Sequence, residues 1–143
     1  MLLGEFLCST DSEGRLTIPS LFCPEFVEGV TMTRGIERCL LVYPAIEWER
    51  LAEKIRQLPL TSQPARSFAR FIFSGAAVSG TNQEGQLLLP DRLRLYAHIE
   101  DEATVVGLVS HVEIWRPQWW REAKSSFVDE GPTLAEELGE FGI

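Results

Sequence analysis

Two stretches of the chain decide its fold: GEFLCSTDSEGRLTIPS at residues 4–20 and GAAVSGTNQEGQLLLPD at residues 75–91. Each reads as an apolar strand, a tight turn ending in glycine, and a second strand stopped by proline. Laid over each other at an offset of 71 residues, the two stretches match at a series of positions. These matched pairs are Asp11 and Asn82, Gly14 and Gly85, Arg15 and Gln86, and Pro19 and Pro90.

The similarity continues further along the chain after a shift of two residues. VTMTRGIERCLLVYPAIEW at 30–48 aligns with ATVVGLVSHVEIWRPQWW at 103–120, which places Pro44 on Pro117. The chain is therefore a tandem duplication of one β-rich unit. A single unit of about fifty residues buries too little surface to fold alone. We expect the two copies to interleave into one small barrel of mixed α+β class, mainly β, with a helix after each unit.

Each copy is predicted to run as strand, tight turn, strand, short helix, second hairpin and longer helix. In the first copy, the expected strands are residues 5–10, 15–18, 30–33 and 39–43, and the expected helices are 20–28, 45–58 and a segment from 62 onward. Ser20 is the expected cap of the short helix, and Ser62 with Pro64 opens the last one. The chain beyond Phe127 is expected to be a loosely held helix or partly disordered.

Composition and charge limit the class of protein. With 45% hydrophobic and 24% charged residues, the chain resembles soluble globular proteins, and its apolar runs are too short to span a bilayer. The N-terminus carries no basic residues of a secretory signal, so we expect a cytoplasmic protein. The net charge of −8 argues against a nucleic-acid partner, but residues 127–143 hold five acids and no Lys or Arg. The overall negative charge therefore does not exclude a local basic face on the rest of the chain.

The sequence carries no enzyme signature. It contains no G-x-S-x-G, phosphate loop, H-E-x-x-H or Rossmann glycine motif. Three cysteines without a C-x-x-C pair and two histidines do not make a metal cage. The acids at residues 100–102 fall in an expected turn, and His111 beside Glu113 is more often structural than catalytic. We expect no enzymatic activity, no cofactor, no metal and no small-molecule substrate.

The turn from Asp11 to Arg15 is the best candidate for function. Asp11 can cap the turn amides, and Gly14 tolerates a positive φ. Arg15 then has the reach and fork geometry to bind guanine O6 and N7 in a DNA major groove, with Asp11 holding its rotamer. The alternative is that Asp11 and Arg15 only staple the hairpin, and spacing alone favours neither interpretation. Supporting phosphate contacts are expected from Arg34, Arg38, Arg66 or Arg70.

Several separated motifs extend the pattern beyond the turn: GEF, DSEGRLTIPS, TRGIERCLLVYP, EWERL, LPLTSQPARSFARF, EGQLLLP and HVEIW, in this order. With these motifs the chain resembles the MraZ family of bacterial transcription regulators, tandem swapped-hairpin proteins related to AbrB and SpoVT. The resemblance covers roughly residues 1–123. It implies binding of double-stranded promoter DNA through an Asp-x-x-x-Arg hairpin, nucleoid association, and ring-like homo-oligomers. It also implies control of the division and cell-wall gene cluster through short promoter repeats.

The chain departs from the family pattern at the turns themselves. Asp11, Gly14 and Arg15 match the pattern in the first copy, but Glu13 precedes the glycine where the family often has Lys. In the second copy, Asn82 and Gln86 replace Asp and Arg. Gln86 can still pair with adenine, but it brings no charge towards phosphate. We therefore expect Arg15 to be the main DNA-reading residue and Gln86 to contribute less.

Four segments are expected from these alignments: SpoVT-AbrB-like units at 1–51 and 76–123, a helical connector at 52–75 and an acidic tail at 124–143. The main alternative to a regulator is an assembly or protein-interaction module of the same fold with weakened or lost DNA binding. Glu13, Glu84, Gln86 and the net charge of −8 favour that alternative.

Overall fold

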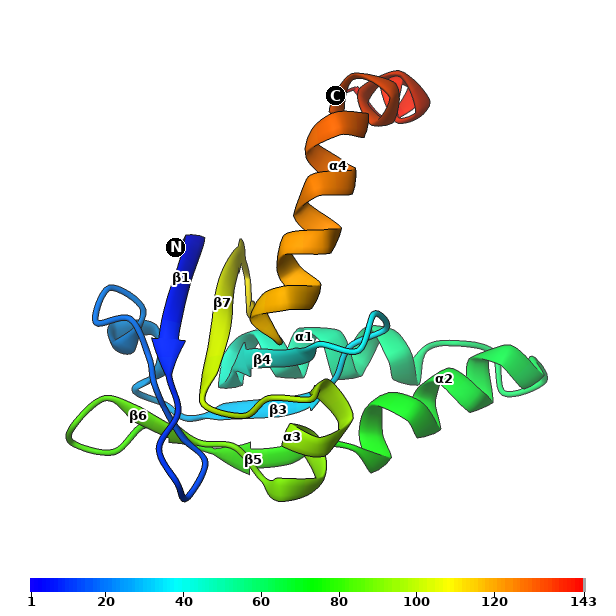
Figure 1. Cartoon of the computed structure of the whole chain (residues 1–143). Coiled ribbons are helices and arrows are strands. Elements are labelled where there is room, and N and C mark those ends of the chain that lie inside the picture. Colours follow the sequence, from blue (N-terminus) through cyan, green and yellow to red (C-terminus); the bar gives the residue numbers. More distant parts are fainter. Residues whose placement is uncertain (143) are drawn as a thin grey trace.

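The structure is a computed structural model that describes residues 1–142, and over these residues it forms eight strands, four α-helices and two short 3₁₀ helices (Figure 1). The first half contains β1 (Leu2–Ser9), β2 (Arg15–Thr17), η1 (Cys23–Phe26), β3 (Val30–Arg34), β4 (Leu40–Pro44), α1 (Ala45–Arg56) and α2 (Gln63–Ser74). The second half contains β5 (Ala77–Ser79), β6 (Gln86–Leu88), α3 (Asp91–Ala97), β7 (Glu102–Val109), β8 (Val112–Trp115), α4 (Pro117–Glu137) and η2 (Gly139–Phe141).

The strands of the two copies interleave, as the duplication predicts. One six-stranded antiparallel sheet has the order β1-β7-β8-β4-β3-β5, and β2 pairs with β6 in a separate two-stranded ribbon. The β1–β7, β8–β4, β3–β5 and β2–β6 pairs each join a strand of one copy to a strand of the other. The expected α+β class with swapped hairpins is therefore confirmed.

The main hydrophobic core lies between the two copies, and Cys39, Val106, Trp115 and Trp120 form a second, smaller cluster. Leu16 of the first copy and its counterpart Leu87 are both fully buried, and so are the equivalent pair Phe22 and Leu93. Burying one such side chain stabilises the fold by about 1.5–3 kcal/mol. Because both members of each pair fill the same core, neither copy has an apolar interior of its own.

The segments flanking the first turn differ from a simple hairpin. β1 pairs with β7 along its whole length, and Thr10, the residue after β1, forms an isolated bridge with Leu16 of β2. The short helix after β2 is the 3₁₀ turn η1, and the expected capping role of Ser20 is wrong, because the cap position is Phe22 and has no side-chain hydrogen bond. Pro24 lies in the first turn of η1, where proline is well tolerated, and the Ser20 carbonyl accepts from the Cys23 amide at 3.3 Å.

Helices α1 and α2 form an antiparallel arm that projects from the sheet (Figure 1). The expected cap at Ser62 is confirmed, since its Oγ accepts from the Ala65 amide at 3.2 Å. Trp48 on α1 packs edge-on against Phe73 on α2, with ring centroids 6.0 Å apart, and against Tyr43 at 6.2 Å. The aromatic contacts fix the inner end of the arm against β4 and leave its outer end in solvent.

The C-terminal segment is a helix over most of its length. α4 runs without a break from Pro117 to Glu137, with Pro132 inside it, and projects from the body (Figure 1). Its first turns are anchored, because the Trp120 indole and the Lys124 ammonium both bind the Glu5 carboxylate. The expected segment borders at 51/52 and 123/124 fall inside α1 and α4. None of the helices described for residues 1–142 is long and apolar enough to cross a membrane.

Candidate nucleic-acid interface

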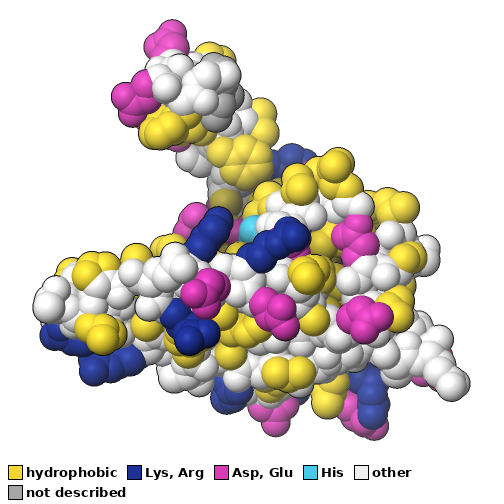
Figure 2. Space-filling model, turned by 180° about the vertical axis from the view of Figure 1, so that it is seen from behind, with side chains coloured by type: hydrophobic (Ala, Val, Ile, Leu, Met, Phe, Trp, Pro, Cys, Tyr) yellow, Lys and Arg dark blue, Asp and Glu magenta, His cyan; other side chains and the backbone are white. Residues whose placement is uncertain are grey.

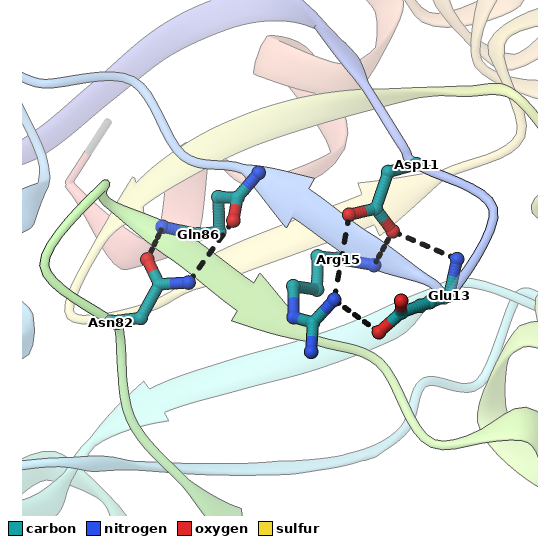
Figure 3. Close-up of polar contacts among 5 residues, drawn as sticks. All are labelled: Asp11, Glu13, Arg15, Asn82 and Gln86. Carbon is teal, nitrogen blue, oxygen red and sulfur yellow. Dashed lines mark hydrogen bonds and ion pairs between the residues drawn. The ribbon is translucent and has the colours of Figure 1, made fainter.

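The first turn, called tip 1 (residues 11–15), is closed by a network centred on Asp11 (Figure 3). Asp11 Oδ1 accepts hydrogen bonds from the amides of Glu13 and Arg15, both at 2.9 Å. The Gly14 amide donates to the Asp11 carbonyl at 3.1 Å, and Gly14 has a φ of +87° that favours glycine. Hydrogen bonds from these amides hold the pKa of the Asp11 carboxyl below its ordinary value, and the bond from the Arg15 amide has the largest effect. The expected capping role of Asp11 is confirmed.

The second turn, called tip 2 (residues 82–86), has the same backbone built with neutral side chains (Figure 3). Asn82 Oδ1 accepts from the amides of Glu84 and Gln86 at 3.0 and 2.9 Å, and Gly85 has a φ of +73°. The Asn82 side-chain amide also donates to Gln86 Oε1 at 3.0 Å. An asparagine can therefore replace aspartate in closing the turn, but Gln86, the side chain that Asn82 holds, carries no charge.

The β2–β6 ribbon places both tips on one exposed surface. Arg15 lies opposite Leu88, and Thr17 lies opposite Gln86, while Leu16 and Leu87 between them are fully buried. Because side chains alternate between the two faces of a strand, the other four point outward together. Arg15 and Gln86 are diagonal neighbours, a relationship that separates residues by about 7–8 Å. We call Arg15, Thr17, Gln86 and Leu88 the ribbon face.

The charge of Arg15 is largely balanced within tip 1. Its guanidinium binds the Glu13 carboxylate and lies 3.8 Å from Asp11 Oδ2. The Arg15 side chain is 38% exposed and that of Glu13 is 65% exposed, so solvent screens the pairing and the contact is weak. Arg15 is therefore held on the surface, where a stronger hydrogen-bond acceptor can replace Glu13 as the partner of its guanidinium.

Comparison with known proteins places this arrangement in a family. The family model described as MraZ protein, antitoxin-like, matches the chain twice, over residues 1–71 and 72–136. The chain belongs to the MraZ family. It is 43% identical to the transcriptional regulator MraZ of Herpetosiphon aurantiacus over 143 residues, covering 100% of both chains. It is 44% identical to that of Thermomicrobium roseum over 138 residues, covering 96% of this chain and 97% of the relative.

Sequence reasoning about the MraZ motifs missed Arg94, which supports tip 1 from the second copy. A Cβ at Gly14 would lie 2.7 Å from Arg94 Nε, so the arginine packs directly on the turn. Arg94 Nη2 binds Asp91 at 2.6 Å, while its Nε is buried without a hydrogen-bond partner in the described part of the chain. Cys23 takes the equivalent place below Gly85 in tip 2. Only a three-dimensional view could find Arg94, since it is distant from tip 1 in the sequence.

Arg34 and Arg38, expected as phosphate contacts, both have partners within this MraZ fold. Arg34 donates to the Phe71 carbonyl through Nε at 3.1 Å and Nη2 at 2.8 Å, and its guanidinium lies over the Phe71 ring. Arg38 lies over the Tyr96 ring at 5.1 Å. These contacts turn the two guanidinium groups towards α2 and α3, where they help to hold the helices against β3.

Arg66 and Arg70, the other expected contacts, lie on α2 in the projecting arm. Arg66 Nη1 donates to the Leu60 carbonyl at 2.8 Å, and Arg70 is exposed. Figure 1 shows α2 and β6 at opposite ends of the molecule. A DNA site at the ribbon face of a MraZ subunit would therefore not extend to Arg66 and Arg70 of the same subunit.

The other titratable candidates have structural contacts. His111 stacks on Tyr43 with centroids 4.4 Å apart, and burial lowers the pKa of its imidazole. Glu113 accepts instead from the Trp115 indole at 2.9 Å. Burial raises the pKa of the Cys39 thiol to about 12, which makes it a poor nucleophile. Over residues 1–142, no group of three or more His, Cys, Asp or Glu side chains is arranged to hold a metal ion.

Proposed function

We propose that this MraZ family member is a transcriptional regulator that binds double-stranded promoter DNA through tip 1. In this proposal it is cytoplasmic and nucleoid-associated, assembles into a homo-oligomeric ring, and reads short repeats upstream of the division and cell-wall gene cluster. The observation that carries the proposal is Arg15, held by the Asp11 network at the exposed end of a two-stranded ribbon. The relatives' name, transcriptional regulator MraZ, supports it. No enzymatic step, cofactor or small-molecule substrate is needed.

The ribbon face supplies the chemistry for reading bases. The major groove of B-DNA admits a two-stranded β-ribbon, and an arginine can bind guanine O6 and N7 through two hydrogen bonds. Gln86, about 7–8 Å away, offers the amide that suits adenine. The methyl groups of Thr17 and Leu88 lie between them and can contact the thymine methyl. Arg15 carries most of the discrimination, because it alone of the four is charged.

One ribbon face is not sufficient for specific binding. A bidentate arginine contact discriminates by about 1–3 kcal/mol, whereas specific DNA sites are bound about 4–10 kcal/mol more tightly than non-specific ones. Several subunits on successive repeats can supply the difference, because the first contact raises the effective concentration of the next. The proposal therefore requires a homo-oligomer, and a single subunit should bind promoter DNA weakly.

An assembly module of the same fold is the second candidate. The observation that favours it is the pairing of Arg15 with Glu13, together with Glu84 in tip 2, which leaves each tip with a formal charge of −1. A negative tip is repelled by phosphate, so DNA binding through it would be weaker than through a basic tip.

Gel-shift titration of the intact protein against tandem promoter repeats and a shuffled control, at several salt concentrations, separates the two candidates. A regulator should prefer the repeats and lose affinity as salt rises. Equal or undetectable binding to both DNAs, even at low salt, would refute the regulator and favour the assembly module.

A further inference from the structure

The C-terminal arm of the chain, residues 127–142, combines negative charge with exposed apolar side chains. Between Ser125 and the C-terminus the sequence has five acids and no Lys or Arg. Its exposed apolar side chains include Phe127, Val128, Leu138 and Phe141, with Phe141 68% exposed. Figure 2 shows magenta and yellow side chains together on this projecting arm. An exposed amphipathic segment of this kind favours burial against a partner.

The outer end of the α1–α2 arm has the opposite charge. From Lys54 to Gln83 the sequence contains no Asp or Glu, and its four cationic side chains are Lys54, Arg56, Arg66 and Arg70, of which Arg56 pairs with Glu53 at 3.2 Å. Leu60 is 82% exposed there, beside a hollow of about 260 Å³ lined by Ile55, Leu58, Ala69 and Phe73 among others. We call this surface the basic end. It offers both an apolar recess and the charges that match the C-terminal arm.

The C-terminal arm and the basic end of one chain point in different directions, so they cannot contact each other within that chain. In Figure 1, α4 projects away from the sheet in one direction, and the α1–α2 arm extends in another. Figure 2 shows the same separation from behind, with dark blue side chains along the α1–α2 arm. The first turns of α4 are fixed by Trp120 and Lys124 on Glu5, so the arm is not free to fold back.

We propose that the C-terminal arm of one chain docks on the basic end of a second copy. The acids face Arg66, Arg70 and their neighbours, and an apolar side chain such as Phe141 enters the hollow. A second copy fits better than DNA, because it offers both the matching charge and the apolar side chains, whereas a phosphate backbone has no group for the recess. The contact is head-to-tail, so it builds a closed ring or an open chain of copies.

This inference rests on the homo-oligomer of the proposed function and names the surfaces that form it. The test uses sedimentation velocity on the full chain, a chain ending at Val128, and Arg66→Glu/Arg70→Glu. The chain ending at Val128 keeps Trp120 and Lys124, which hold α4 to the body through Glu5. The matched control is Glu28→Lys/Glu122→Lys, which reverses two exposed acids outside both surfaces.

The full chain and the control should sediment as multiples of 16.1 kDa, and both altered chains should sediment as single copies. An equimolar mixture of the two altered chains should form 1:1 pairs, because one supplies the arm and the other the basic end. Joining Arg66→Glu/Arg70→Glu with Glu136→Lys/Glu137→Lys in one chain should restore large assemblies. A full chain that is monomeric, or an altered chain that assembles like the full one, would overturn the proposal.

DNA binding is measured separately, so the two proposals can fail independently. Assembly through these surfaces without preference for promoter repeats would refute the regulator and leave the docking intact. If Arg66→Glu/Arg70→Glu assembles normally but loses DNA affinity, the basic end binds DNA, and the docking proposal is refuted.

Discussion

Arg15 and Gln86 are diagonal neighbours on the outer face of the β2–β6 ribbon, although they are 71 residues apart in the sequence and come from different copies. Each is the first residue of its strand, and each amide is held by the side chain that opens its turn. The two tips are therefore geometrically equivalent positions with unequal chemistry. Exchanging side chains between them separates the effect of geometry from that of charge.

Installing the first-copy chemistry in the second tip should strengthen DNA reading. In Asn82→Asp/Gln86→Arg, the existing turn would hold a second arginine on the same ribbon face. One bidentate arginine contributes about 1–3 kcal/mol, so preference for promoter repeats over shuffled DNA should rise about 5- to 150-fold per subunit. Gln86→Ala, by contrast, should change affinity little. Fluorescence anisotropy titrations at fixed salt measure both, and a strong loss in Gln86→Ala would contradict the ranking.

Removing the carboxylate that pairs with Arg15 should tighten DNA binding. Glu13→Gln frees the guanidinium from an exposed ion pair worth about 0.2–1 kcal/mol and removes one charge that phosphate repels. We expect affinity to rise about 2- to 10-fold at low salt. Glu84→Gln is the matched control, since it makes the same charge change in a tip without arginine. It should give a smaller gain, and equal gains would show that only net charge matters.

The packing of Arg94 on tip 1 should make Gly14 less replaceable than Gly85. Both glycines have positive φ, which costs another residue about 1–2 kcal/mol. In Gly14→Ala the new Cβ would also lie 2.7 Å from Arg94 Nε, whereas in Gly85→Ala the nearest atom is Cys23 Sγ at 3.3 Å. Urea denaturation should show the larger loss of stability for Gly14→Ala. Adding Arg94→Ala should recover part of it, and strict additivity would exclude the contact.

Stability should depend on pH through Glu113. Burial raises the pKa of the Glu113 carboxyl in the folded state. The loss of folding stability that comes from ionising this buried carboxyl is therefore absent below the unfolded pKa and appears as pH rises through the folded pKa. Glu113→Gln keeps an acceptor for the Trp115 indole and should raise Tm by about 2–4 °C at pH 7. The gain should vanish near pH 3.5. Glu122→Gln, an exposed site, should give no such pH-dependent gain in thermal denaturation.

Much of the fold followed from sequence because the same pattern occurs twice. Paired positions such as Gly14 and Gly85 showed the duplication, and short units with open strand edges required interleaving. The cap at Ser62 and the turns closed by Asp11 and Asn82 follow from local chemistry. These features depend on a few neighbouring residues, which is why a single sequence predicts them.

Other features depend on contacts between distant segments. Arg94 reaches tip 1 only after the copies interleave, and Arg34 finds the Phe71 carbonyl only once α2 lies beside β3. Composition alone left a loosely held helix and partial disorder open for the C-terminal segment, and the structure has one helix that continues through Pro132. Its first turns are held by Glu5, over a hundred residues away in the sequence. Local patterns carry no information about such partners.

The specificity ratio of Arg15→Lys is the most direct test of the central claim. Lysine keeps the charge towards phosphate but lacks the planar fork that binds guanine through two hydrogen bonds. The ratio of affinities for promoter repeats and shuffled DNA, measured by gel shift at one salt concentration, should fall about 5- to 150-fold, while binding to shuffled DNA changes little. An Arg15→Lys protein that keeps the original ratio would contradict the assignment of Arg15 as the DNA-reading residue.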